Sequence, residues 1–316
     1  MRLKIWGCRG SVPTPGPQTV HYGGNTSCVE VSLDDGAVLV LDAGTGIIRL
    51  GLELLERGVR RTHLLLTHLH LDHLEGLRFF APLWDARVRL DIWGPPSPLL
   101  SLRERISRSF SPPLFPIDLR EVPASVAFRD VPREPWTVEG ASLAADLIVH
   151  PGPTVGFRIE AGGSAFAYIP DHEPALAGAI QSRSSDWLSG ASIAEDVDLL
   201  IHDAQYFEDE YEERIGWGHS SVADAVAFTH AVGARRLLLF HHEPRHADGS
   251  LAPRSARAAS RRAERCRPDA RPRGHGRRAA LGGATRLSSS ADASRGRRTC
   301  PPGRRRPASS SPSRTS

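Results

Sequence analysis

The segment at residues 67–77 concentrates side chains that bind metal ions. It reads Thr-His-Leu-His-Leu-Asp-His-Leu-Glu-Gly-Leu, so three histidines and one aspartate, His68, His70, Asp72 and His73, lie within six positions. Neutral imidazole is the commonest metal ligand in proteins, and carboxylate is its harder partner. The four residues directly before this segment are apolar enough for a buried strand. The sequence therefore predicts a metal site where a strand ends in a loop.

The pattern His-x-His-x-Asp-His resembles the signature of the metallo-β-lactamase superfamily, a large group of binuclear metallohydrolases. Three further residues match that family's pattern, and each follows a short apolar run: His150, Asp171 and His241. Asp42, in Leu-Asp-Ala-Gly-Thr-Gly, resembles an early aspartate that supports the site without binding metal. These motifs occur in family order, and the resemblance covers residues 1 to about 245.

The resemblance implies that seven side chains hold two divalent metal ions. They divide into two ligand sets and one bridge: His68, His70 and His150 for the first ion, Asp72, His73 and His241 for the second, and Asp171 between them. Zinc is favoured, with manganese and iron as alternatives. Metals roughly 3.5–4 Å apart can share a water and lower its pKa. The implied reaction is hydrolysis by a metal-bound hydroxide, in which Asp72 also counts as a catalytic residue and no protein nucleophile is needed.

A second constellation lies at residues 198–220. This stretch begins Asp-Leu-Leu-Ile-His-Asp-Ala-Gln-Tyr and ends Gly-Trp-Gly-His-Ser, and it resembles the phosphodiesterase branch of the superfamily, which includes ribonuclease Z. The resemblance implies that His219 donates a proton to the leaving oxygen and that Asp203 orients it. Imidazole has a suitable pKa, and an alkoxide leaving group needs a proton. A helix N-terminal residue bonded to solvent is the alternative role for His219.

Other polar residues near these motifs have weaker assignments. His172, His202 and His242 each neighbour a candidate, and we expect them not to bind metal because adjacent side chains in a strand point to opposite faces. Asn25 and Ser27 lie in a stretch that also resembles the phosphodiesterase branch. They could bind phosphate oxygens, or they could simply form a turn.

Two features favour a small substrate over RNA. Ribonuclease Z carries a long tRNA-gripping arm between the residues that match His150 and Asp171, whereas here only residues 151–170 separate them, which is hairpin length. Residues 1–250 contain 22 basic and 33 acidic residues, a net charge that does not attract a polyanion. We therefore predict a phosphodiesterase acting on a small phosphodiester, such as a cyclic nucleotide. The alternatives are a ribonuclease Z-like RNA endonuclease, a hydrolase of another ester or a lactam, and a non-catalytic metal-binding module.

Composition divides the chain into a catalytic domain at residues 1–250 and a tail at 251–316. The tail contains 18 arginines, no lysine and three acidic residues, with almost no large apolar side chains. Such a segment cannot bury enough surface to offset its ordering entropy, so we expect it to be disordered. A nucleic-acid-binding arm and a tether to an anionic surface are two functional alternatives. A shifted reading frame after about Gly249 would explain its composition.

Apolar patterns in residues 1–250 predict alternating strands and helices. Residues 45–57 have helical apolar spacing, and residues 222–231 are expected to form a helix that begins after Ser220 and Ser221. Strands are expected at 2–6, 28–33, 37–41, 63–66, 88–93, 143–149, 154–160, 164–169, 197–201 and 236–240. Residues 95–135 are rich in proline and predict an irregular insertion near the mouth of the site. Two sheets covered by helices fit this order, and the resemblance implies the four-layer αβ/βα sandwich of an α/β protein.

The sequence also bears on the cellular localisation of the protein. No run reaches the roughly 18 apolar residues of a membrane helix, and the first residues lack the apolar stretch of a signal peptide. The four cysteines are too few and too scattered for a disulfide framework. We expect a cytoplasmic protein without a membrane segment, and a homodimer is an open alternative.

Overall fold

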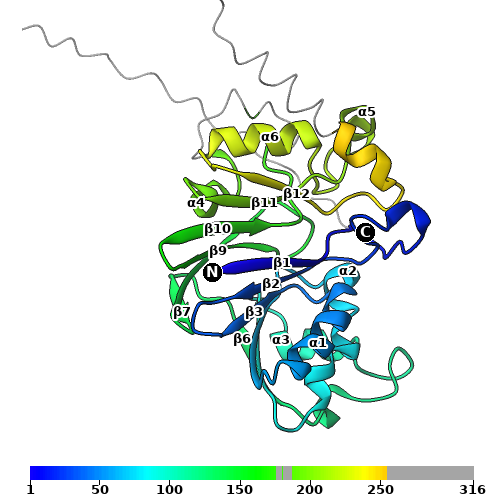
Figure 1. Ribbon diagram of the computed structural model, residues 1–316, viewed down its shortest axis with the longest axis vertical. Helices are drawn as coiled ribbons and strands as arrows, with labels where there is room; N and C mark the ends of the chain where they lie inside the picture. Colours follow the sequence, from blue (N-terminus) through cyan, green and yellow to red (C-terminus); the bar gives the residue numbers. More distant parts are fainter. Residues whose placement is uncertain (176–179, 181–186, 255–316) are drawn as a thin grey trace, which may run out of the picture. The chain divides into compact units, whose positions relative to one another are not determined.

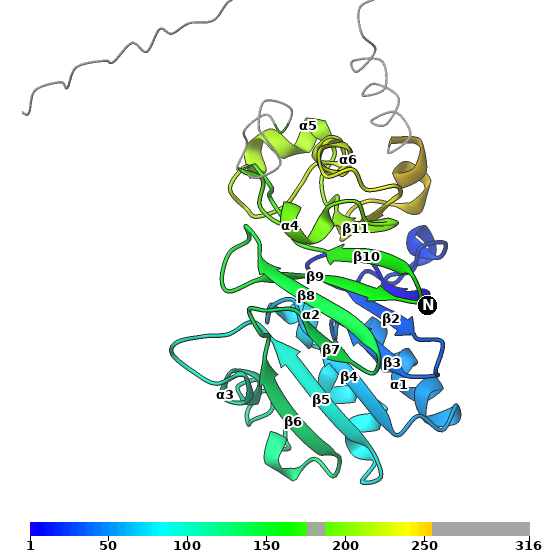
Figure 2. The same ribbon diagram turned by 90° about the vertical axis from the view of Figure 1, so that its left-hand side faces the viewer.

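Two six-stranded sheets lie face to face, with helices on their outer sides (Figures 1 and 2). The computed structural model describes residues 1–175, 180 and 187–254. The strand order is β1-β2-β3-β4-β5-β6 in one sheet and β12-β11-β10-β9-β8-β7 in the other. This arrangement is the four-layer αβ/βα sandwich, so the predicted fold class is confirmed.

The first sheet is formed by the N-terminal half of the described chain. Strands β1 to β3 are antiparallel and β3 to β6 are parallel. Its strands are β1 (Arg2–Gly7), β2 (Cys28–Ser32), β3 (Val38–Leu41), β4 (Arg61–Leu65), β5 (Arg89–Gly94) and β6 (Ser125–Asp130). The outer face carries α1 (Gly46–Glu56), α2 (Leu71–Leu74) and α3 (Leu102–Ser107).

The second sheet begins with antiparallel hairpins and ends with parallel strands. Strands β7 to β10 are antiparallel, whereas β10, β11 and β12 are parallel. Its strands are β7 (Trp136–Val138), β8 (Ala141–Leu147), β9 (Val155–Ala161), β10 (Ser164–Ile169), β11 (Leu199–Asp203) and β12 (Leu237–Phe240). The other helices are α4 (Ala191–Ala194), α5 (Glu208–Tyr211) and α6 (Val222–Ala231), and α4 and α6 pack on this sheet.

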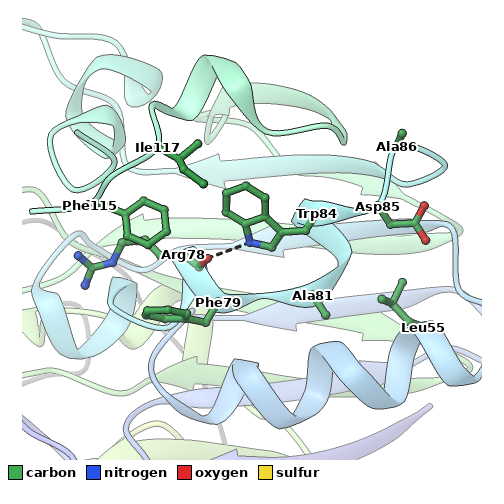
Figure 3. A pocket seen from close by; sticks show the side chains of 9 residues that line it. All are labelled: Leu55, Arg78, Phe79, Ala81, Trp84, Asp85, Ala86, Phe115 and Ile117. Atoms are coloured by element: carbon green, nitrogen blue, oxygen red, sulfur yellow. Dashed lines mark hydrogen bonds between the residues drawn. The ribbon is translucent and has the colours of Figure 1, made fainter. Parts of the chain in front are cut away.

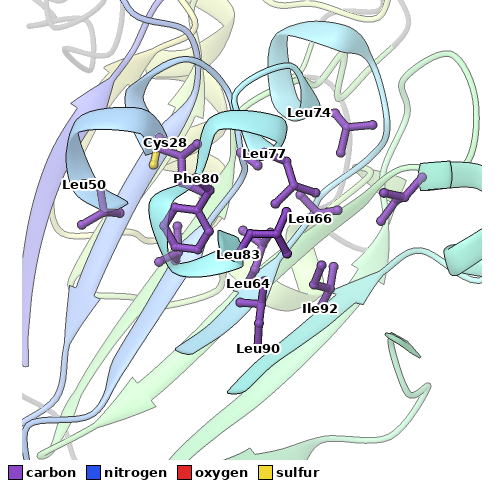
Figure 4. Packing of buried hydrophobic residues seen from close by; sticks show 14 of the residues in the cluster. Cys28, Leu50, Leu64, Leu66, Leu74, Leu77, Phe80, Leu83, Leu90 and Ile92 are labelled. Atoms are coloured by element: carbon purple, nitrogen blue, oxygen red, sulfur yellow. The ribbon is translucent and has the colours of Figure 1, made fainter. Parts of the chain in front are cut away.

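Buried apolar side chains fill the three spaces between the four layers. One cluster lies between the sheets and joins residues such as Val31 and Leu39 to Phe157 and Phe166. A second packs α1 against the outer face of the first sheet and includes Leu50, Phe80 and Leu64 (Figure 4). A third packs α4 and α6 on the second sheet. The sheets can therefore present the ends of their strands along one edge without losing their cores.

Residues 95–135 are more regular than predicted. They contain α3 and the edge strand β6, which pairs in parallel with β5 along its whole length. Strand β6 is only half-buried and ends in two exposed residues, so its sequence lacks the alternation that identifies a strand. The short strand β7 was not predicted either. In contrast, the predicted bounds of β10 and α6 agree with the structure.

The predicted domain boundary at residue 250 falls inside a helix. Residues 248–254 are helical, and Leu251 is buried against Phe207, Val222 and Ala225. The expectation of an unpacked tail is therefore wrong for residues 251–254. The rest of the predicted tail, residues 255–316, lies outside the described residues. Within the described part of the chain, no helix has the length and apolar character needed to cross a membrane.

An ion pair connects this C-terminal helix to the N-terminal loop. Arg9 is fully buried, and its guanidinium donates to Asp248 Oδ1 at 2.6 Å. The same group donates to the carbonyl oxygens of His246 at 2.6 Å and Gly23 at 3.0 Å. The other Asp248 oxygen accepts the backbone N–H of His21 at 2.6 Å. Asp248 thus neutralises a buried charge and joins two ends of the described chain.

Replacing Asp248 by alanine should destabilise the protein by about 3 kcal/mol, because it leaves the Arg9 charge buried without its carboxylate. Urea denaturation of the full chain, followed by circular dichroism, measures this loss. Asp118→Ala removes an aspartate from the exposed pair with Arg120 and is the matched control, with a smaller expected loss. Equal losses in the two variants would contradict the assignment of Asp248.

Candidate metal centre

The candidate metal ligands come from the ends of strands in both sheets. His68 follows β4, and Asp72 and His73 lie in the short helix α2 directly after it. His150 follows β8, Asp171 follows β10 and His241 follows β12. The carboxyl ends of neighbouring parallel strands meet at one edge of a sheet, which explains why residues far apart in sequence converge here.

The structure brings all seven predicted ligands into two adjacent groups. Within each group, ligand atoms lie within 4.8 Å of one another. The groups are His68, His70 and His150, and Asp72, His73, Asp171 and His241. One oxygen of Asp171 is 3.3 Å from His241 Nε2 and 3.8 Å from His68 Nε2. Asp171 therefore lies between the groups, where a bridging carboxylate would have to be.

Four of the histidines have their Nδ1 atoms engaged by hydrogen-bond acceptors. His73 Nδ1 donates to Asp42 Oδ2 at 2.8 Å, and His150 Nδ1 donates to the carbonyl oxygen of Gly218 at 2.8 Å. His241 Nδ1 faces the amide oxygen of Gln205 at 3.1 Å. His68 Nδ1 faces the hydroxyl of Thr67 at 3.1 Å. A proton on Nδ1 leaves the lone pair on Nε2, which is the usual arrangement for histidines that bind metal.

The free lone pairs converge on each other, and this contact fits a cation. His73 Nε2 and His241 Nε2 are 3.3 Å apart, and His150 Nε2 is 3.2 Å from His70 Nδ1. The buried His68 Nε2 has no hydrogen-bond partner among the described residues. Buried polar atoms normally have partners, so lone pairs that face each other need a positive charge between them. The donor set, imidazole nitrogen with carboxylate oxygen, is one that zinc accepts.

The charge states of the three histidines in the first group and of Asp171 also suit a metal. Burial lowers the pKa of His68, His70 and His150, so these imidazoles are neutral. Burial alone would raise the pKa of Asp171, but interaction with the surrounding histidines, His241 first, holds it well below its usual range. Neutral imidazole and ionised carboxylate are the forms that bind metal ions.

Asp42 supports this centre by a hydrogen bond to the ligand His73, as the resemblance implied. It follows β3, is fully buried, and adopts a left-handed backbone conformation with φ 59°. It accepts hydrogen bonds from the Thr67 backbone N–H and hydroxyl, His73 Nδ1 and the Tyr168 hydroxyl. Burial and the Asp42 charge raise the pKa of Tyr168 well above its usual value, so this hydroxyl remains a donor. Asp42 therefore fixes the ring of His73.

His219 and Asp203 form a hydrogen-bonded pair beside the metal-ligand groups. His219 Nδ1 lies 2.7 Å from Asp203 Oδ2, and Asp203 is fully buried. The His219 ring centroid is 5.0 Å from those of His150 and His241. Burial alone would lower the pKa of His219, but the Asp203 charge and hydrogen bond raise it. A residue bonded only to solvent, the alternative role for His219, does not fit this geometry.

Some polar neighbours lie away from the centre. His172 and His202 are buried and face each other at 2.9 Å, and they join no candidate metal group among the described residues. The same is true of His242, where burial lowers the pKa to about 3. Ser27 is fully buried, and the Asn25 amide donates to the Trp6 carbonyl oxygen at 3.3 Å. This burial and this hydrogen bond favour the turn-forming role over phosphate binding for Asn25 and Ser27.

The sequence did not reveal several contributors to the centre. The Ser11 backbone N–H donates to Asp72 Oδ2 at 2.8 Å, and Gln205 orients His241. A Cβ atom on Gly10 would lie 2.5 Å from His241 Nδ1, so only glycine fits at this close approach. Which residue this N-terminal loop touches depends on the fold and not on local sequence.

A separate cavity of about 700 Å³ lies between α1 and the segments that follow α2 (Figure 3). Its lining is mainly apolar and includes Phe79, Trp84 and Phe115. None of the described candidate metal ligands lines it. This cavity is therefore separate from the strand-end centre.

Comparison with known proteins agrees with this geometry. A ribonuclease Z of Haloarcula marismortui is 28% identical over 285 residues, covering 78% of this chain and 88% of that protein. The metallo-β-lactamase fold protein YhfI from Bacillus subtilis superimposes with a TM-score of 0.58 at 18% identity, over 82% of this chain and 92% of that one. The short form of human tRNase Z gives 0.55 at 21% identity, over 77% and 93%.

Residues 38–242 match the family described as "Beta-lactamase superfamily domain", which covers more than half of the chain. The matched range contains every candidate metal ligand together with His219 and Asp203. The chain therefore belongs to the metallo-β-lactamase superfamily and is a metal-dependent hydrolase of that superfamily.

Proposed function

We propose that this chain is a binuclear phosphodiesterase. The observation that carries the proposal is the position of Asp171 between two ligand groups, with His219 and Asp203 beside both. Two ligand groups that share a carboxylate suit two cations, and a histidine paired with a carboxylate suits proton transfer. A phosphodiester needs both features, since its alkoxide leaving group requires a proton.

Each group of residues has a distinct task in this proposal. His68, His70 and His150 would hold one cation, Asp72, His73 and His241 would hold the other, and Asp171 lies within reach of both groups. When bound, paired divalent cations, of which zinc suits these ligands best, activate a water and stabilise the attacking and leaving oxygens. Asp203 keeps the Nδ1 proton of His219 fixed, so the His219 Nε2 proton is free for the leaving oxygen.

A small phosphodiester is our preferred substrate. Only the hairpin of β9 and β10 occupies the chain between His150 and Asp171, so no long arm extends from this position to grip a large ligand. The excess of acidic over basic residues in residues 1–250 also opposes a polyanion. Cleavage of RNA is the second candidate, because curated relatives that cover 78% of this chain are named ribonuclease Z.

Replacing His219 by alanine should lower turnover of a poor-leaving-group phosphodiester by about 10²–10⁴-fold, the usual contribution of a general acid. Metal content, measured by plasma mass spectrometry, should not change. The loss should shrink for a nitrophenyl ester, because nitrophenolate needs little protonation. Equal losses for good and poor leaving groups would contradict the proton-donor role.

Replacing His70 by alanine should reduce the metal content from two ions toward one, because it removes one of three ligands from the first group. Activity should fall for every substrate, whatever its leaving group. His172→Ala removes a buried histidine outside the candidate groups and serves as the comparison for metal content. An unchanged metal content in His70→Ala would remove this residue from the ligand set.

A panel of substrates separates the two candidate functions. We expect the zinc-loaded full chain to hydrolyse cyclic nucleotides or nitrophenyl phosphodiesters and to leave a precursor tRNA intact. β-Lactams and carboxylic esters complete the panel. Site-specific cleavage of the precursor tRNA, without turnover of the small diesters, would favour the ribonuclease alternative.

A further inference from the structure

The loop that carries His219 is held by a buried carboxylate. Glu173 is 1% exposed and accepts the backbone N–H of Gly216 at 2.9 and 3.0 Å, one distance for each oxygen. It also accepts the N–H of Gly218 at 2.9 Å. Both glycines have φ 85°, a left-handed conformation that favours glycine. The residue between them, Trp217, therefore has a fixed backbone on both sides.

The same loop is bonded directly to the candidate metal centre. The carbonyl oxygen of Gly218 accepts the Nδ1 proton of His150, a candidate metal ligand. A Cβ on Gly218 would lie 2.7 Å from His150 Nδ1, so the loop packs tightly on this residue. His219 follows at once, with its own bond to Asp203. A side chain at position 217 is thus one residue from a metal-ligand contact and two from the candidate proton donor.

Trp217 nevertheless keeps 58% of its surface exposed. Two other exposed apolar side chains lie next to groups of the centre. Leu71, 66% exposed, lies between His70 and Asp72, and Val12, 52% exposed, follows the residue whose N–H bonds to Asp72. Three separate segments that contact the metal-ligand groups thus each carry an exposed apolar residue. An exposed indole offers a flat face on which a planar ring can stack.

We propose that Trp217 is a specificity-determining residue that stacks on a planar aromatic group of the substrate, such as the base of a nucleoside phosphodiester. The inference rests on the proposed phosphodiesterase function and narrows its substrate class. The carboxylate of Glu173 keeps the loop in place without substrate, so little ordering is needed when the ring binds. No bond is made or broken by Trp217 itself.

Two substrates with the same leaving group test this role. Thymidine 5′-(4-nitrophenyl) phosphate carries a base, and methyl 4-nitrophenyl phosphate does not. Trp217→Ala should raise KM for the thymidine ester by roughly 5- to 150-fold, the effect expected from one lost base stack, with little change in kcat. KM for the methyl ester should change much less, and Trp217→Phe should restore most of the binding. Phe79 is an aromatic residue of similar exposure, 57%, in the cavity of Figure 3. As the control, Phe79→Ala should change KM for neither ester.

Calorimetric titration of the full chain with thymidine 5′-monophosphate tests the contact without turnover. Weaker binding by Trp217→Ala supports the stacking role whether or not the wild-type chain hydrolyses the esters. If the wild-type chain hydrolyses neither ester, that result overturns the phosphodiesterase proposal alone. Equal affinities in wild type and Trp217→Ala, or equal KM increases for the two esters, would overturn the stacking role. A defect confined to cleavage of precursor tRNA would overturn it as well.

Discussion

The buried carboxylate of Asp42 is the interaction on which the candidate centre depends. It has no exposed surface and accepts hydrogen bonds from both halves of the fold, Thr67 and His73 on one side and Tyr168 on the other. A buried negative charge is tolerated only when such donors surround it. The same bonds orient His73 and join the two sheets beneath the metal-ligand groups. The same hydrogen bonds of Asp42 therefore fix both the position of the centre and the packing of the two sheets.

The centre also depends on contacts between the two ends of the described chain. The N-terminal loop passes close to His241, where Gly10 leaves no room for a side chain. The Gly10 N–H donates to the His242 carbonyl oxygen, and Arg9 is held by Asp248 in the C-terminal helix. The helix at residues 248–254 is thus linked to a metal-ligand group through a buried ion pair. Composition predicted that the domain ends at residue 250, but the helix that spans this boundary helps to hold the loop beside His241 in place.

A different carboxylate organises the loop that carries His219. Glu173 binds the backbone of Gly216 and Gly218, while Asp203 binds the His219 ring. Glu173 lies in the segment that follows β10, and Asp203 is the last residue of β11, so both belong to the second sheet. Support for the candidate proton donor and for the proposed substrate contact therefore comes from one edge of the second sheet. This common origin explains how a few strand ends can combine binding, positioning and proton transfer.

The sequence by itself determined whatever depends on neighbouring residues. The spacing of residues 67–77 predicted clustered ligands, and the serines before residue 222 predicted where α6 begins. Tertiary structure decided the partners: Tyr168 reaches Asp42 across 126 positions, and Arg9 reaches Asp248 across 239. It also decided that Leu251 is buried and that β6 completes a sheet. Local patterns indicate which face of an element is apolar. The packing of the two sheets determines which distant polar groups come into contact, and the spacing of residues within one segment does not predict those contacts.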